Sequence, residues 1–256
     1  MANDYELRIC PGPEEVASAA AELFAVEHSQ AIQERGRFRV ALSGGSSPRR
    51  TYQLLAETNY RPRIDWSKTD LFWGDERYVP PEHRDSNYRM VREALLQHVP
   101  LGPENVHRVP TEIDPPQAAA GAYEKEIRRT FGLASGVPSF DLVFLGLGGN
   151  GHTASLFPGS PLLHEASRLA AAEFVAEADS WRLTLTLPVL NQGRTIAFLV
   201  AGEEKADILR EVLRGPYTPE KLPAQLIRAQ QGKLLWIVDR AAASKLGPGI
   251  GRPSAA

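Results

Sequence analysis

The chain has 256 residues, with 29 Lys and Arg against 31 Asp and Glu, and its formal net charge is −2. A hydrophobic fraction of 43% and a charged fraction of 23% are ordinary for globular proteins and exclude disordered, collagen-like and coiled-coil chains. The balanced charge excludes the broad basic field typical of nucleic-acid binding, and no stretch reaches the roughly 18 apolar residues of a membrane span.

A single cysteine, Cys10, cannot form an intrachain disulfide, so a reducing compartment is expected. The first six residues lack the basic start and apolar run of a signal peptide. The histidines have no H-x-x-x-H or carboxylate spacing that would indicate a metal site. We therefore expect a cytoplasmic protein with no metal and no cofactor, which binds neither nucleic acid nor membranes.

Short β-rich runs alternate with helical stretches along the chain. The expected strands are Tyr5–Cys10, Phe38–Leu42, Thr69–Trp73, Phe140–Leu145, Arg182–Leu187, Thr195–Val200 and Leu234–Val238. The first expected helix starts at Pro13. Four others are expected at about Pro48–Ala56, Asp85–Gln97, Pro116–Phe131 and Glu203–Leu213. This alternation predicts an α/β protein whose mostly parallel sheet is packed on both faces. We expect one domain over residues 1–256, in which residues around 80–130 are the candidate for a small lobe and residues 247–256 for a frayed tail.

Four segments directly follow expected strands, which is where ligands bind in open α/β sheets. The first is the loop Ser43–Pro48, in which paired glycines precede a helix. Free backbone N–H groups and serine hydroxyls at a helix start suit a phosphate or carboxylate. The alternative is a plain Gly-Gly turn with a serine N-cap. The spacing and lysine of a Walker loop are absent.

Two further segments carry charge. In Gly74–Arg77, the Asp75 carboxylate is suited to sugar hydroxyls and the Arg77 guanidinium to a phosphate. In Gly202–Lys205, the ammonium of Lys205 stands at an expected helix start, and Arg182 is another cationic candidate. Taken one at a time, each of these charges is explained as well or better by a solvated surface or a local ion pair.

The remaining segment, Gly146–His152, matches G-x-G-x-x-G literally. A dinucleotide fingerprint needs a full helix after the loop, whereas Pro158 and Gly159 end any helix here after fewer than two turns. The glycines instead suit close approach to a small ligand. His152 is a candidate general base because its ordinary pKa lies near neutral pH, and a helix-capping histidine is the alternative.

Together these segments resemble the 6-phosphogluconolactonase family. The resemblance is carried by Ala41–Pro48, Phe72–Pro80 with Ser86–Tyr88, Phe140–Pro158, Leu185–Gln192 and Phe198–Lys205, and Gly151–Pro158 is its most specific part. It implies a three-layer αβα sandwich around a modified Rossmann-like sheet (a deaminase/isomerase-like fold) that uses no nicotinamide. It also implies hydrolysis of 6-phospho-D-glucono-1,5-lactone to 6-phospho-D-gluconate, the second step of the oxidative pentose phosphate pathway.

The resemblance suggests roles for individual residues. His152 is expected to activate water, and the other catalytic candidates are Asp75 and Asn150. Many relatives carry Asp where this chain has Asn150, which keeps a hydrogen bond but adds no charge. The substrate-binding candidates are Ser43, Gly44, Gly45, Ser46, Ser47, Arg77, Gly149, Gly151, Arg182 and Lys205. The expected partner is a small sugar phosphate, and the chain is expected to be a monomer or a weak homo-oligomer.

Two other functions remain open at this point. An amino-sugar-phosphate isomerase/deaminase would resemble this chain in the Gly-Gly loop and the Gly-His turn. Such relatives place a carboxylate where this chain has Phe157, and an apolar ring cannot shuttle a proton. A non-catalytic sugar-phosphate sensor would keep the phosphate site and have no need of His152.

Overall fold

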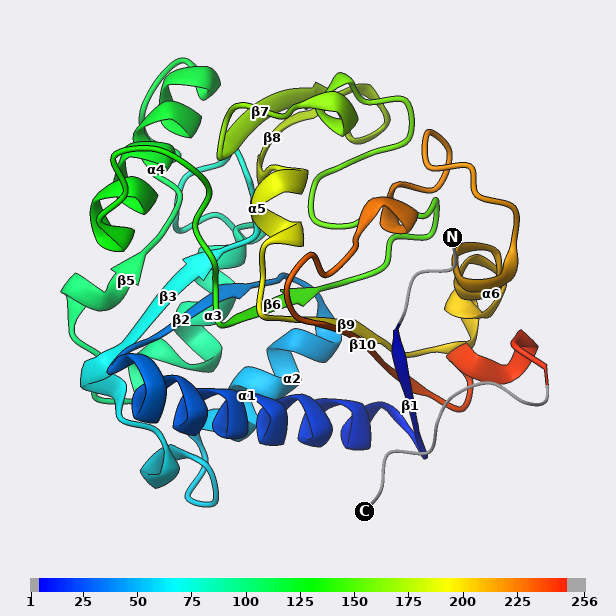
Figure 1. Cartoon of the computed structure of the whole chain (residues 1–256), viewed down its shortest axis with the longest axis horizontal. Coiled ribbons are helices and arrows are strands. Elements are labelled where there is room, and N and C mark those ends of the chain that lie inside the picture. The colour runs from blue at the N-terminus through cyan, green and yellow to red at the C-terminus, as the bar shows by residue number, and fades with distance from the viewer. Residues whose placement is uncertain (1–4, 248–256) are drawn as a thin grey trace.

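The computed structural model describes residues 5–247, and the expected frayed tail lies, apart from Gly247, outside this range (Figure 1). Within it, seven parallel strands form the main sheet in the order β1-β10-β9-β6-β2-β3-β5. Their bounds are β1 Glu6–Cys10, β10 Lys233–Asp239, β9 Thr195–Val200, β6 Leu142–Leu145, β2 Phe38–Leu42, β3 Thr69–Trp73 and β5 Val106–His107. The expected parallel sheet is confirmed.

Helices cover both faces of this sheet. They are α1 (Pro13–Arg35), α2 (Ser46–Ala56), α3 (Asn87–Ala94), α4 (Pro116–Phe131), α5 (Leu187–Asn191) and α6 (Ala206–Arg214). In Figure 1, α1 and α2 lie on one side of the sheet and α5 on the other. The three-layer αβα sandwich is therefore confirmed. Within residues 5–247, none of the helices combines the length and apolar character that crossing a membrane requires.

Local chemistry explains where the longest helix begins and ends. Pro13 occupies the first turn of α1, where its missing N–H costs nothing, and Glu14 and Glu15 complement the positive end of the helix. Gly36 ends the helix in the left-handed conformation, with φ of 73°, and its N–H donates to the Ile32 carbonyl. These signals are local in the sequence, which is why the start at Pro13 was predictable.

A second, antiparallel sheet was not expected. It consists of β4 (Asp75–Arg77), β8 (Ser180–Leu185) and β7 (Ala170–Val175), in the order β4-β8-β7. The strand expected at Arg182–Leu187 is therefore shifted by two residues and lies outside the parallel sheet. Pro188 lies in the first turn of α5, so the chain turns into a helix where a strand was expected to end.

Several boundaries also differ from expectation. The helix expected at Asp85–Gln97 is the shorter α3, whose N-cap Ser86 accepts a hydrogen bond from the Arg89 N–H. The helix expected at Glu203–Leu213 begins as a 3-10 turn, Glu203–Lys205, and continues as α6. Residues 80–130 contribute β5 to the main sheet, and the small lobe stays a prediction.

Candidate functional site

The loops after four neighbouring strands, β2, β3, β6 and β9, line one pocket of about 390 Å³. Its walls include Ser43–Pro48, Asp75, Arg77, Gly146–Gly149, His152 and Lys205. Because parallel strands end at the same edge of a sheet, loops far apart in the sequence meet there. Three sequence-predicted residues, Asn150, Gly151 and Arg182, are not among those that line the pocket.

The orientation of His152 is set by Asn150. The Asn150 side-chain oxygen lies 2.6 Å from His152 Nδ1 and also accepts the His152 backbone N–H at 3.2 Å. An amide oxygen can only accept, so Nδ1 carries the proton and Nε2 keeps its lone pair. Asn150 thus holds the neutral imidazole in the tautomer that a general base needs.

The side-chain amide of Asn150 is itself oriented by Glu177, a residue that was not predicted from the sequence. The Asn150 Nδ2 donates to Glu177 Oε2 at 3.3 Å, which leaves the amide oxygen facing His152. Glu177 lies in a short 3-10 turn between β7 and β8, 27 residues beyond Asn150. Nothing in the local sequence marks it, because its role comes from the hairpin that carries it.

Burial lowers the pKa of His152. The negative charges of Asp75 and Glu177 act in the opposite direction, and the positive charges of Lys205 and Arg182 add to the lowering. The net effect keeps the imidazole neutral at neutral pH. A neutral imidazole with a free Nε2 can accept a proton from water.

The backbone at Gly148 lies against the His152 ring. A Cβ built on Gly148 would lie 2.1 Å from ring atoms Cε1 and Nδ1, closer than any real contact. The Gly148 N–H donates to the His152 carbonyl at 2.8 Å, and the Gly151 N–H donates back to Gly148 at 3.0 Å. Gly148 therefore must be glycine for the imidazole to lie where it does, and Gly151, with φ of 81°, shapes the turn.

Phe157 stacks on the imidazole of His152. The two ring centroids are 4.3 Å apart with an interplanar angle of 26°, which is a stacked arrangement. An apolar ring thus stands at the position where an isomerase/deaminase is expected to carry a carboxylate. This contact also contributes to the burial that lowers the pKa of His152.

Asp75 is held by two side chains that the sequence reading did not assign to the site. Ser155 Oγ donates to Asp75 Oδ2 at 2.7 Å, and Asn87 Nδ2 donates to the Asp75 backbone oxygen at 3.0 Å. The neighbouring Glu76 is buried and accepts the backbone N–H groups of Asn87 and Tyr88, both at 2.7 Å. The segment after β3 is therefore tied to the start of α3.

The glycine loop after β2 ends in an uncapped helix start. Gly45 is the N-cap of α2 and provides no side-chain hydrogen bond, so the serine N-cap of the alternative explanation is absent from this helix start. The first-turn N–H groups, including those of Ser46 and Ser47, have no intrahelical acceptor. Tyr52 holds the loop from behind, because its hydroxyl accepts the Ser43 N–H at 3.0 Å and donates to the Ser43 carbonyl at 2.9 Å.

Three cations stand in or near the pocket. Arg77 and Arg182 face each other across β4 and β8, and repulsion by Arg77 adds to burial in lowering the pKa of Arg182. Arg77 donates to the Asp85 backbone carbonyl at 2.7 Å. Within residues 5–247, neither arginine nor Lys205 forms a salt bridge with a carboxylate. Their positive charge remains available to an anionic ligand.

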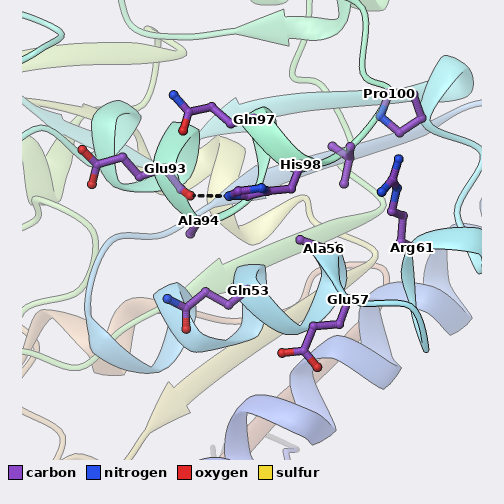
Figure 2. Close-up of a pocket in the computed structure, with 10 residues that line it drawn as sticks. Gln53, Ala56, Glu57, Arg61, Glu93, Ala94, Gln97, His98 and Pro100 are labelled. Carbon is purple, nitrogen blue, oxygen red and sulfur yellow. Dashed lines mark hydrogen bonds between the residues drawn. The ribbon is translucent and has the colours of Figure 1, made fainter.

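A larger hollow, of about 710 Å³, lies elsewhere, between α2 and the end of α3 (Figure 2). Glu57, Glu93 and Arg61 are among its polar walls, and His98 Nε2 lies 3.0 Å from the Glu93 carbonyl oxygen. It is broad and open, and no glycine loop or strand end converges on it. We therefore place the functional site in the smaller pocket. Residues 5–247 contain no cluster of three His, Cys, Asp or Glu side chains suited to a metal ion.

The chain is similar to several known proteins. The family described as glucosamine-6-phosphate isomerases/6-phosphogluconolactonase matches residues 11–236. The 6-phosphogluconolactonase of Synechocystis sp. is 43% identical over 222 residues, which cover 86% of this chain and 89% of that protein. The solved 6-phosphogluconolactonase from Trypanosoma cruzi has a TM-score of 0.83 at 29% identity, covering 96% of this chain and 98% of that one.

A monomeric glucosamine-6-phosphate deaminase also superposes, with a TM-score of 0.79 at 21% identity, covering 94% of this chain and 99% of that one. At this identity the likeness shows the fold alone. The match of the family over residues 11–236 and the identity to the Synechocystis protein go further. The chain belongs to the glucosamine-6-phosphate isomerase/6-phosphogluconolactonase family.

Proposed function

We propose that His152 is the general base with which this chain acts as a 6-phosphogluconolactonase, hydrolysing 6-phospho-D-glucono-1,5-lactone to 6-phospho-D-gluconate. The observation that carries the proposal is the Asn150 contact, which leaves Nε2 of a neutral imidazole free in the pocket. His152 takes a proton from water as the water oxygen attacks the lactone carbonyl. The imidazolium then protonates the ring oxygen as the ester bond breaks, which returns the base to its neutral form.

The negative charge that develops on the carbonyl oxygen needs hydrogen-bond donors. Candidates are Arg77 and the backbone N–H groups of the Gly146–Gly149 loop that the loop itself does not use. Preorganised donors of this kind stabilise a tetrahedral intermediate by about 3–4 kcal/mol. Asp75, held by Ser155 and Asn87, is the candidate for binding sugar hydroxyls.

The phosphate of the substrate is assigned to the loop of Ser43, Gly44, Gly45, Ser46 and Ser47. Support comes from the uncapped start of α2, whose free N–H groups and dipole favour an anion. Lys205 lines the same pocket, and Arg182 adds positive charge nearby. Binding this remote dianion would fix the lactone carbonyl against the attacking water.

The function is tested by following lactone disappearance at neutral pH against a blank without protein, with the unphosphorylated glucono-1,5-lactone as comparator. We expect kcat/KM at least about 100-fold higher for the phosphorylated lactone, because charged hydrogen bonds to the phosphate contribute about 1.5–3 kcal/mol each. Release of ammonia from glucosamine 6-phosphate would instead support a deaminase. Thermal stabilisation by 6-phosphogluconate without any turnover would support a sensor.

The pH dependence of kcat/KM tests the state of His152. Because burial lowers the pKa of His152, the imidazole stays neutral into mildly acidic solution, and the rate should fall only below the ordinary value of about 6.5. In Asn150→Asp, a carboxylate beside Nδ1 favours the charged imidazolium, so the acidic limb should move to higher pH. Titration of the substrate phosphate is common to both proteins and cancels in the comparison. Superimposable acidic limbs would contradict the role of Asn150.

We propose the cytoplasm as the location, and a free sugar phosphate as the partner. Support comes from the lone cysteine and from the near-neutral charge of the chain. The location is tested by measuring which fraction of a fractionated cell extract contains the lactonase activity.

A further inference from the structure

Within residues 5–247, no strand pairs with the outer side of β1, at one edge of the main sheet. β1 (Glu6–Cys10) is the terminal strand and pairs with β10 on one side, while the opposite terminal strand, β5, has only two residues. In the view of Figure 1, β1 lies at the side of the sheet far from α4 and β5. A five-residue edge presents backbone donors and acceptors that a further strand can use.

The pairing pattern identifies which groups point outward. The Arg240 N–H donates to the Cys10 carbonyl at 3.0 Å, so the backbone groups of Cys10 point toward β10. Because these directions alternate along a strand, those of Glu6 and Arg8 also point toward β10. The N–H and C=O groups of Leu7 and Ile9 therefore face away from the sheet.

The side chains on this edge carry complementary charges. Glu6 and Arg8 flank Leu7, and both are exposed. Within residues 5–247, neither forms a salt bridge. The charge of Arg8 contributes to lowering the pKa of Glu22 in α1. A strand with opposite charges on either side of a central residue is complementary to its own copy in antiparallel orientation.

We propose that two copies of this chain associate weakly through β1, antiparallel about a two-fold axis at Leu7. The outward N–H and C=O of Leu7 then bond with those of Leu7 in the second copy, as a hydrogen-bonded pair. Glu6 lies opposite Arg8 of the second copy, and the symmetry makes this ion pair twice. Cross-strand pairs of opposite charge stabilise a sheet, and like charges directly opposite destabilise it.

Charge selects this register over its neighbours. An axis at Arg8 would place the two Arg8 side chains directly opposite each other, which is repulsive. An axis at Ile9 would set Arg8 against Cys10 and leave both Glu6 carboxylates unpaired. Only the Leu7-centred register satisfies both charges and uses the outward backbone groups of Leu7.

Apolar surface beside β1 favours the same association. Val26 of α1 and Ile9 of β1 are 49% and 45% exposed. Between α1 and the edge strands, a cavity of about 250 Å³ is lined in part by Leu23, Val26, Leu235 and Ile237. Ile9 lies on the other face of the sheet from this cavity, and in the proposed pair it lies opposite Tyr5 of the second copy, so that the contact is self-complementary, as a two-fold interface requires.

The test is the mass of the full-length protein, measured by sedimentation velocity across the micromolar range. The wild type should shift from the mass of one chain toward that of two as the concentration rises. Arg8→Glu and Glu6→Arg each place like charges opposite one another twice, and each should raise the dimer dissociation constant about tenfold or more. The double variant Glu6→Arg/Arg8→Glu restores complementarity and should dimerise like the wild type.

Two further variants separate the edge from general effects. Lys125→Glu changes the same charge at an exposed position on α4 and should leave the dimer unchanged. Ile9→Pro removes an outward N–H without removing a bond to β10, so it should weaken the dimer while lactonase activity confirms the fold. A wild type that stays monomeric throughout, or single charge variants that dimerise as well as the wild type, would overturn the proposal. So would a double variant that remains monomeric.

Discussion

His152→Ala is expected to lower kcat by about 100- to 10,000-fold, the range over which a positioned general base contributes. KM should change little, because the Ser43–Ser47 loop and Lys205 remain in place to bind the phosphate. The measurement is initial lactone hydrolysis, with the spontaneous rate subtracted at each pH. The residual activity should lose the acidic limb that the imidazole gives to the wild type.

The chain offers a matched control for this variant. His98→Ala removes another histidine, which lines the larger hollow of Figure 2 and whose Nε2 lies 3.0 Å from the Glu93 carbonyl oxygen. We expect its kcat and KM to match the wild type. A His152→Ala protein with wild-type turnover would contradict the assignment of the active site to the pocket that His152 lines. So would a His98→Ala protein without turnover.

Gly148→Ala is the second large expected effect, although alanine adds a single methyl group. That methyl would lie 2.1 Å from the His152 ring, so the imidazole must move away from Gly148, and its stacking on Phe157 must change. A displacement of about 1 Å in a catalytic group can cost roughly 100-fold in rate. We expect kcat to fall by about that factor, with the substrate still bound.

Gly149→Ala provides the comparison one residue further along the same loop. A Cβ at Gly149 meets no heavy atom within 4 Å, so the imidazole is undisturbed. We expect activity within a few-fold of the wild type and an unchanged midpoint of thermal unfolding. Equal losses in both variants would mean that the loop tolerates no side chain at all, and that displacement of His152 is not the cause.

The parallel sheet was predictable because its signals are local. Apolar runs such as those of β2, β3 and β9 have the bounds that the sequence indicated. The small antiparallel sheet was not predictable in the same way. β4 is a charged tripeptide, Asp75–Arg77, that becomes a strand only because β8 pairs with it.

The residues of the candidate site also fall into those that local sequence predicts and those that it does not. His152 and the loops of Ser43–Ser47, Asp75 and Lys205 could be named from the sequence because each follows an apolar strand. Glu177 and Phe157 acquire their roles only in space, the one by turning the Asn150 amide and the other by stacking on the imidazole. No periodicity or local motif encodes contacts of this kind.

By itself, the amino-acid sequence determined most strands of the parallel sheet, the start of the longest helix, the glycine-rich turns and the resemblance to the family, since these depend on residues near one another in the chain. Only the tertiary structure decided the tautomer of His152, the direction of its pKa shift and the absence of carboxylate partners for the cations around the pocket in residues 5–247. The physical reason is that burial and electrostatic environment are sums over neighbours brought together by folding, and the linear sequence does not list those neighbours.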